Sequence, residues 1–296
     1  MKKEALIELM VFVDDSNLDA STVMICSLAI EKKTFDSLVK KIRKKHGILS
    51  KLPEIHYKEF DRADNKKRNL ANSYIDYIAD KSYEKKIFLN IVIADKSKLK
   101  TGEKRGAKRD THIETIFTRL SITYSINRFS YKYRKIVVKK ITIDKGGKTD
   151  NSFFQQYALS KILTRSKAKL PKNIDYIDSD PRKEEKKNAK YAVFVDIIDL
   201  ILGSCKNCCS KKRSENKYKR NISEKIFNDL LIRVSAKRSK IGKINTYPRI
   251  RKTQKHTDKL LSGGLHQKKR YIYSENPILR KKFAPKPYVQ ITKWDR

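Results

Sequence analysis

The stretch Ile7–Asp15, IELMVFVDD, decides how the fold begins. Its apolar run ends at two adjacent aspartates, and Asn17 supplies a turn signal before a second apolar run at 22–30, TVMICSLAI. Two apolar runs joined by a short polar turn are typical of neighbouring antiparallel strands. The spacing therefore predicts that the sheet begins as an antiparallel meander, with Asp14 where the first strand stops.

Strands and helices alternate after this pair. Apolar residues at helical spacing predict helices over 34–45, 67–80, 110–128 and 189–205. Further strands are predicted over 87–96, 135–144 and 173–178. This order favours an α/β fold in which a mixed sheet is flanked by helices. Because ligands gather where the strands of such sheets end, the strand-end aspartates are candidate site residues: Asp14, Asp95 and Asp144.

The segment 191–203, YAVFVDIIDLILG, predicts a buried helix because it is nearly all apolar. Asp196, Asp199 and Gly203 share one face of this helix. Burying two carboxylates side by side is costly unless a cation or hydrogen-bond donors neutralise them. The same face could instead point at solvent or at a basic neighbour, which would leave the glycine unexplained. We therefore expect a functional acidic face here.

The predicted carboxylates have the chemistry of a metal site. Asp14, Asp144 and Asp199 would supply the hard oxygen ligands that suit Mg²⁺ or Mn²⁺, and Asp196 is expected to be a further ligand. Two such ions activate water and stabilise the leaving oxygen in phosphodiester hydrolysis. Adjacent strand residues face opposite ways, so only one of Asp14 and Asp15 is expected to enter the site directly. We favour Asp14, with Asp15 assisting.

The charge of the chain points to an anionic partner. Its 296 residues hold 71 Lys+Arg against 33 Asp+Glu, a net charge of +38. A compact particle with this charge repels itself unless an anion is bound, and nucleic acid, either DNA or RNA, is the usual partner. An anionic membrane surface is the weaker alternative, and an AT-rich genome would also enrich lysine on solvated faces.

The sequence shows no signal for export or membrane insertion. The first apolar run carries Glu4 and Glu8 and ends in aspartates, unlike a signal peptide. No apolar stretch reaches transmembrane length, and 4 cysteines do not make a disulfide scaffold in a chain of this size. We expect a cytoplasmic protein that does not enter membranes.

The last third of the chain differs in composition, because residues 204–296 hold 27 Lys+Arg and 6 Asp+Glu. We expect a domain over 1–205 and a basic extension over 206–296, irregular except for one helix at 222–235. Cations can hold phosphates and aromatic rings can stack on bases. The candidate nucleic-acid contacts are Lys58, Lys145, Lys148, Arg182, Lys211, Lys212, Arg213, Tyr271 and Tyr273. The aromatic residues of the extension could equally dock it onto the domain.

Three cysteines lie close together at the end of the last predicted helix of the domain. Cys205 and Cys208 have the spacing of one half of a zinc site, and Cys209 follows directly. Because no second cysteine pair exists, reduced thiols at a helix end are the favoured interpretation.

The ordered motifs resemble the bacterial family called domain of unknown function 3800. FVDDSN, at 12–17, is similar to the Asp-Glu-Ser-Gly motif that follows the family's first strand. IHYKEF, IVIADK and ITID match its next motifs in order, and VFVDIIDLILG resembles its late helix LQLADLIAG. The resemblance spans about residues 7–205. It implies a ribonuclease-H-like fold and metal-dependent nuclease chemistry, in a family linked to mobile elements or phage defence.

The resemblance also assigns roles to single residues. Asp199 and Gly203 fall on the family's Asp and Gly, whereas Asp196 stands where the family usually has Gln. Within IHYKEF, the chemistry of His56 suits a general acid or base or a residue that orients a carboxylate, and it suits equally an exposed or merely hydrogen-bonded histidine. Glu59 is expected to be a fourth ligand. Asp15 replaces the family's Glu with a shorter side chain.

Two functions remain open at this point. The first is a Mg²⁺- or Mn²⁺-dependent nuclease that hydrolyses DNA or RNA at the aspartate cluster. The alternative is a non-catalytic nucleic-acid-binding protein that keeps the fold within a ribonucleoprotein or nucleoprotein assembly. Substrate type, cleavage specificity and oligomeric state are not determined by the sequence.

Overall fold

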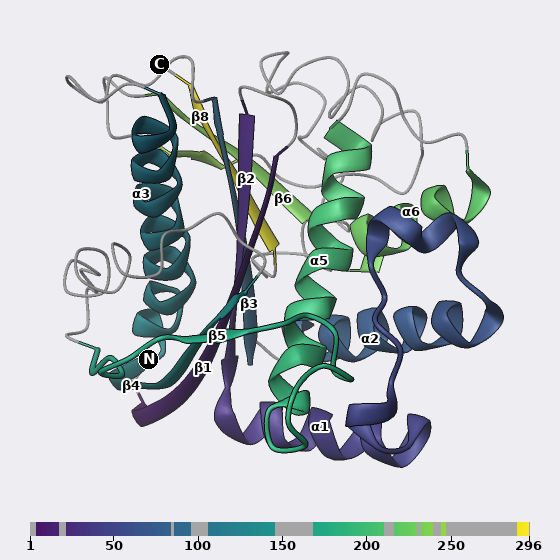
Figure 1. Cartoon of the computed structure of the whole chain (residues 1–296). Helices are drawn as coiled ribbons and strands as arrows, with labels where there is room; N and C mark the ends of the chain where they lie inside the picture. Colours follow the sequence, from purple (N-terminus) through teal and green to yellow (C-terminus); the bar gives the residue numbers. More distant parts are fainter. Residues whose placement is uncertain are drawn as a thin grey trace, which may run out of the picture.

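Most of the first 229 residues and three later strands are placed in the computed structural model. It describes residues 4–17, 22–83, 86–95, 106–145, 168–209, 216–229, 232–238, 244–246 and 289–295. Within these ranges the chain forms one mixed eight-stranded sheet with helices on both faces (Figure 1).

The first five strands form the centre and one edge of the sheet. They are β1 (Glu4–Asn17), β2 (Thr22–Glu31), β3 (Ile87–Asp95), β4 (Tyr133–Asp144) and β5 (Asp175–Ile177). β1, β2 and β3 are an antiparallel meander, whereas β4 pairs parallel with β1, and β5 pairs parallel with β4. The resulting order β3-β2-β1-β4-β5 is that of the ribonuclease-H-like fold. The predicted α/β class and mixed sheet are confirmed.

Three strands from the C-terminal part of the chain extend this sheet beyond β3. They are β6 (Ile232–Arg238), β7 (Ile244–Thr246) and β8 (Val289–Asp295). β8 lies between β3 and β6 and pairs parallel with both, and β7 pairs antiparallel with β6. The helix expected over 222–235 exists, but its bounds are Lys217–Asp229 (α6), and residues 232–238, expected to be helical and then irregular, form a strand.

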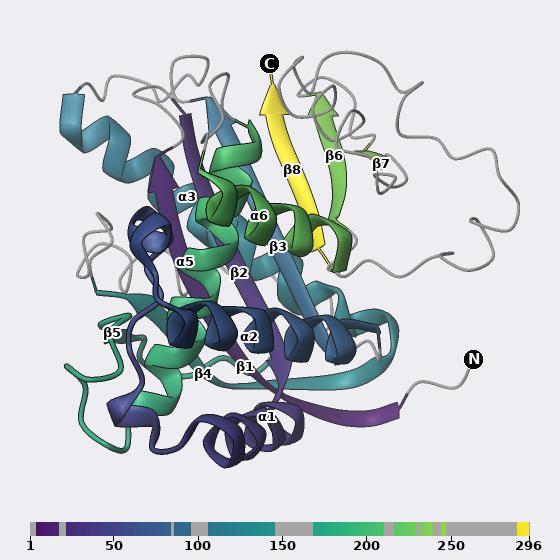
Figure 2. The ribbon, with the colours of Figure 1, turned by 90° about the vertical axis from the view of Figure 1, so that its right-hand side faces the viewer.

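The helices cover the two faces of the sheet unequally. One face carries α1 (Lys32–His46), α2 (Asn65–Tyr83), α5 (Ala189–Cys209) and α6, and the other carries α3 (Gly106–Asn127) (Figures 1 and 2). The predicted helices correspond to α1, α2, α3 and α5. No helix in the described ranges combines the length and the apolar character that a membrane crossing requires.

Alternation along β1 separates two hydrophobic cores. Leu9, Val11 and Val13 pack on the α3 side of the sheet, and Met10 and Phe12 pack on the α5 side. Continuing this alternation places Asp14 on the α5 side and Asp15 on the α3 side.

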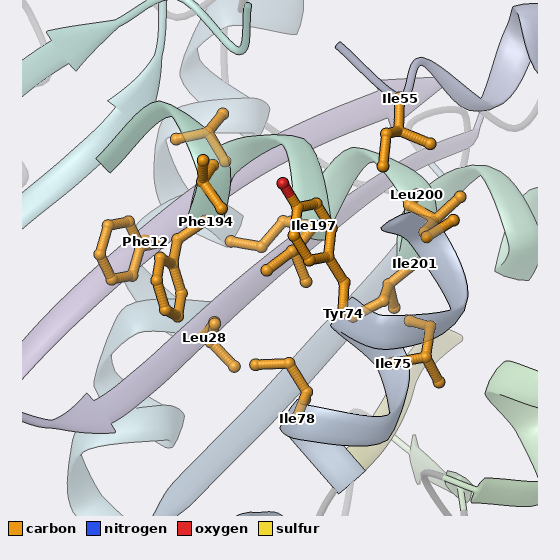
Figure 3. Close-up of a cluster of buried hydrophobic side chains, with 14 of the residues drawn as sticks. Phe12, Leu28, Ile55, Tyr74, Ile75, Ile78, Phe194, Ile197, Leu200 and Ile201 are labelled. Atoms are coloured by element: carbon orange, nitrogen blue, oxygen red, sulfur yellow. The ribbon is translucent and has the colours of Figure 1, made fainter. Parts of the chain in front are cut away.

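Aromatic packing fixes α5 on this face of the sheet. The ring of Phe12 stacks on that of Phe194 in α5, with centroids 5.1 Å apart, and on that of Phe35 in α1, with centroids 5.7 Å apart. Further along α5, Ile197, Leu200 and Ile201 pack with side chains of α2 (Figure 3). The buried face of α5 is thereby held over the end of β1 that carries Asp14.

Candidate carboxylate site

Two of the predicted aspartates lie side by side on neighbouring strands. Val13 of β1 pairs with Ile143 of β4, so the next residues, Asp14 and Asp144, are adjacent on the same face of the sheet. β4 ends at Asp144 as predicted, but β1 continues to Asn17 and pairs Asp14 with Cys26 of β2. Asp14 therefore lies inside its strand, because β2 continues to supply hydrogen-bond partners beyond it.

Asp14 is a buried carboxylate surrounded by like charges. The residue is 6% exposed, and one of its oxygens accepts the backbone N–H of Asp15 at 2.7 Å. Burial raises the pKa of Asp14 well above its ordinary value, and the charges of Asp199, Asp144 and Asp15 raise it further. The structure thus brings Asp14, Asp144 and Asp199 near enough to repel one another.

Asp199 reaches this region from α5 and is held by two donors. One of its oxygens, Oδ2, lies 2.8 Å from Nδ1 of His56 and accepts the backbone N–H of Tyr57 at 3.0 Å. The side chain of Asp199 is 21% exposed and that of His56 is 41% exposed. The hydrogen bond to Asp199 raises the pKa of His56, and burial opposes this while the charges of Asp199, Glu54 and Glu59 add to it. His56 and Asp199 therefore form an ion pair when the imidazole is protonated.

Asp196 is fully buried and binds the backbone. Its Oδ1 accepts the N–H of Ile55 at 2.9 Å, whereas its Oδ2 is buried with no hydrogen-bond partner among the described residues. Burial raises the pKa of Asp196 well above its ordinary value, although the hydrogen bond from Ile55 opposes this rise. The charges of Asp199, Glu54 and Asp180 raise the pKa further. The predicted role of Asp196 as a metal ligand stays a prediction.

Gly203 completes the acidic face of α5 for a packing reason. A Cβ at this position would overlap the Cβ and Cγ atoms of Tyr57, so only glycine leaves room for the tyrosine. Asp196, Asp199 and Gly203 thus each hold one part of the segment 55–57, which precedes and enters the 3-10 helix η2 (Tyr57–Arg62). The shared face predicted from the sequence exists, and its described partner is this segment.

The tyrosine of this segment also contacts α6. The hydroxyl group of Tyr57 lies 3.0 Å from Ser223 Oγ, and Nζ of Lys219 donates to the carbonyl of Lys58 at 2.7 Å. Lys58 itself has an exposed side chain, and Glu59 is also exposed. Sequence reasoning missed this involvement of α6, because its residues carry no spacing that relates them to 55–57.

The carboxylates of this site are chemically suited to a divalent cation. Carboxylate oxygens are the ligands of Mg²⁺ and Mn²⁺, and a cation would relieve the repulsion around Asp14. Among the side chains that the structure describes, however, no three His, Cys, Asp or Glu residues are grouped so that they could hold a metal ion. Oδ2 of Asp199 contacts His56 and Tyr57 instead. The expected Mg²⁺ or Mn²⁺ stays a prediction.

The other predicted nucleic-acid contacts are only partly within the described residues. Arg182 makes two side-chain hydrogen bonds of 2.8 Å to the carboxylate of Asp180, which is almost fully buried. Lys145 is exposed beyond the end of β4. Several predicted contacts lie outside the described residues: Lys148, Lys211, Lys212, Arg213, Tyr271 and Tyr273.

The structure leaves the cysteine motif incomplete. Cys205 is buried on α5 and forms no disulfide with a described cysteine. The side chains of Cys208 and Cys209 lie outside the described part of the chain. The interpretation as reduced thiols at a helix end therefore stays a prediction.

Comparisons with known proteins add little to this geometry. No family model matches the chain, and no curated protein matches it, so the resemblance to domain of unknown function 3800 stays a prediction. The solved structure of ribonuclease H2 from Pyrococcus horikoshii OT3 is similar with 11% identity and a TM-score of 0.29, over 74% of this chain and 87% of that chain. Likeness at this level carries no argument, so the fold assignment depends on strand order and pairing alone.

Proposed function

We propose that the protein is a metal-dependent nuclease whose site is formed by Asp14, Asp144 and Asp199. The observation that carries this proposal is the position of Asp14, which is buried on β1 beside Asp144 of β4. Its pKa is raised by that burial and by the charges of Asp199 and Asp144. A buried carboxylate with like charges beside it is costly to keep ionised. A divalent cation would offset that cost and would supply an activated water for phosphodiester hydrolysis.

Each residue of the site would have its own role in this reaction. Asp14 and Asp144 would hold the cation from the sheet, and Asp199 would hold it from α5. His56, which is partly exposed and has a raised pKa, would leave Asp199 and carry a proton to or from the substrate through its imidazole. The high positive charge of the chain would hold the substrate phosphates.

The test is cleavage of labelled single-stranded DNA, RNA and an RNA–DNA hybrid with Mg²⁺, Mn²⁺ or EDTA. Asp14→Asn and Asp199→Asn should each lower the cleavage rate by about 100-fold or more, because each removes a metal-binding charge. Asp36→Asn is the matched control, since Asp36 is a partly exposed carboxylate that pairs with Lys32 on α1. Cleavage that survives both site variants, or that persists in EDTA, would sink the proposal.

A second candidate, a nucleic-acid-binding protein without catalysis, is favoured by one specific observation. No described group of side chains is arranged to hold a metal ion, and the carboxylate of Asp199 pairs with His56. This function predicts binding that is salt-sensitive and indifferent to Mg²⁺, with no turnover under any metal. Isothermal titration with Mn²⁺ separates the two, because only the nuclease should bind the ion in a manner abolished by Asp14→Asn.

A further inference from the structure

Tyr218, in the first turn of α6, is the most exposed aromatic side chain among those that the structure describes. It is 39% exposed, whereas the other Phe and Tyr side chains that the structure describes are buried or partly buried. The guanidinium carbon of Arg68, in the first turn of α2, lies 3.5 Å from the centre of its ring. Arg68 therefore covers one face of the ring and leaves the remaining exposed part open to solvent.

Exposed cationic residues lie on the two helices that carry this stacked pair and on η2 beside them. α6 packs against both α2 and η2, so three elements meet at this place (Figure 2). Each of them contributes side chains that are exposed and that form no ion pair within the described residues: Lys58, Arg62, Lys66, Lys217 and Arg220. We call these five residues, with Arg68 and Tyr218, the Arg68–Tyr218 surface.

This surface is continuous with the carboxylate site through a short series of contacts. Lys219, next to Tyr218, donates through Nζ to the carbonyl of Lys58 at 2.7 Å. Lys58 directly follows Tyr57, whose N–H binds Asp199. A strand lying across the surface would therefore approach Asp199 from the α6 side.

We propose that the Arg68–Tyr218 surface binds an unpaired strand of nucleic acid, with a base stacked at Tyr218 and the backbone phosphates on the surrounding cations. A base in a duplex has both faces covered by its neighbours, whereas an unpaired base has a face free for an aromatic ring. Arg68 keeps the ring in place and adds a planar cation beside it. This inference depends on the proposal that the protein acts on nucleic acid, and it specifies which form of the substrate is held and where.

The experiment is fluorescence polarisation with labelled single-stranded and double-stranded oligonucleotides in EDTA, so that no cleavage occurs. Tyr218→Ala should weaken binding of the single strand by about 5- to 100-fold, which is the range expected for one lost base stack. Tyr218→Phe keeps the ring and should stay within about 2-fold of the parent. Binding of the duplex should be unchanged in both variants.

The salt dependence separates stacking from charge. Tyr218→Ala removes no charge, so it should leave the slope of log Kd against log salt unchanged, whereas Lys217→Ala should reduce that slope by about 1. Lys40→Ala removes an exposed charge from α1, away from the surface, and should have a smaller effect than Lys217→Ala. Circular dichroism melting of each variant shows whether it is folded.

Two outcomes would overturn the inference. An unchanged affinity in a folded Tyr218→Ala variant would mean that the stack only joins α2 to α6. Equal losses in Lys40→Ala and Lys217→Ala would mean that binding is spread over the whole basic surface. If instead Asp14→Asn still cleaves while Tyr218→Ala binds weakly, the proposed catalytic site fails and this surface remains.

Discussion

At the scale of single residues, Asp196 shows a conflict between a useful hydrogen bond and a costly charge. The N–H of Ile55 needs an acceptor, and Oδ1 supplies it. The negative charge has no described partner on Oδ2, and burial raises the pKa of the carboxyl group. An asparagine would keep the acceptor and remove the charge.

We therefore expect Asp196→Asn to stabilise the protein in EDTA at neutral pH, by about 1–3 kcal/mol, because it removes a buried charge, although the amide NH2 group that replaces Oδ2 offsets part of the gain. The sign follows from proton linkage: the pKa of Asp196 is higher in the folded state than in the unfolded state, so stability is lost as pH rises through that interval. The stability of the Asp196→Asn variant should therefore fall less than that of the parent as the pH rises. Thermal melts from about pH 4 to 8 measure it, and a variant less stable than the parent at neutral pH would contradict the expectation.

At the scale of elements, the contact between α5 and the segment 55–57 positions half of the candidate site. Asp196, Asp199 and Gly203 lie along one face of α5, and each contacts a successive part of the segment. The glycine is the position where substitution has no easy relief, because the overlapping atoms belong to the root of the Tyr57 side chain.

Gly203→Ala should lower the free energy of unfolding by about 1–3 kcal/mol, because the added methyl group forces Tyr57 and its backbone away from α5. Chemical denaturation measures the loss. Tyr57→Phe is the matched comparison, since it keeps the ring against Gly203 and removes only the hydroxyl contacts with Ser223 and with the carbonyl of Lys219. A Gly203→Ala protein as stable as its parent would show that the segment can move at little cost.

The sequence predicts one side of this contact and misses the other. Apolar composition and the spacing of Asp196 and Asp199 are local features, and they correctly predict a buried helix with a shared acidic face. The partner of that face lies 141 residues away along the chain, measured from Ile55 to Asp196. No periodicity relates the two segments, so only the fold reveals that backbone N–H groups neutralise part of the acidic face.

At the scale of the whole molecule, one sheet joins the early strands to strands that follow residue 230. The early strands are predictable because their apolar runs are long and lightly charged. The apolar spacing around residues 226–231 instead predicts a helix that runs into β6, whose own apolar residues Ile232, Val234 and Ala236 alternate with Arg233, Ser235 and Lys237. Its period-2 pattern was the signal that could have identified it.

Deleting residues 289–295 should lower the melting temperature by more than about 5 °C, because β3 and β6 both lose their backbone pairing with β8. The deletion also leaves β3 as an open edge, which should promote self-association. Differential scanning calorimetry and light scattering measure the two effects, and deletion of Arg296 alone is the control. An unaltered melting profile would contradict the pairing.

The position of β8 also sets an order of events in time. Leu89 of β3 pairs with Val289 of β8, and β6 reaches the sheet only through β8. During synthesis, β6 and β7 are therefore translated well before β8, which joins them to β3. Pairing β8 with β3 brings together residues that are far apart along the chain, and such contacts form slowly. Until it closes, the nascent chain carries a finished meander with a bare edge beside a highly cationic segment, and this is the interval in which a chaperone or a polyanion would have most influence on its yield.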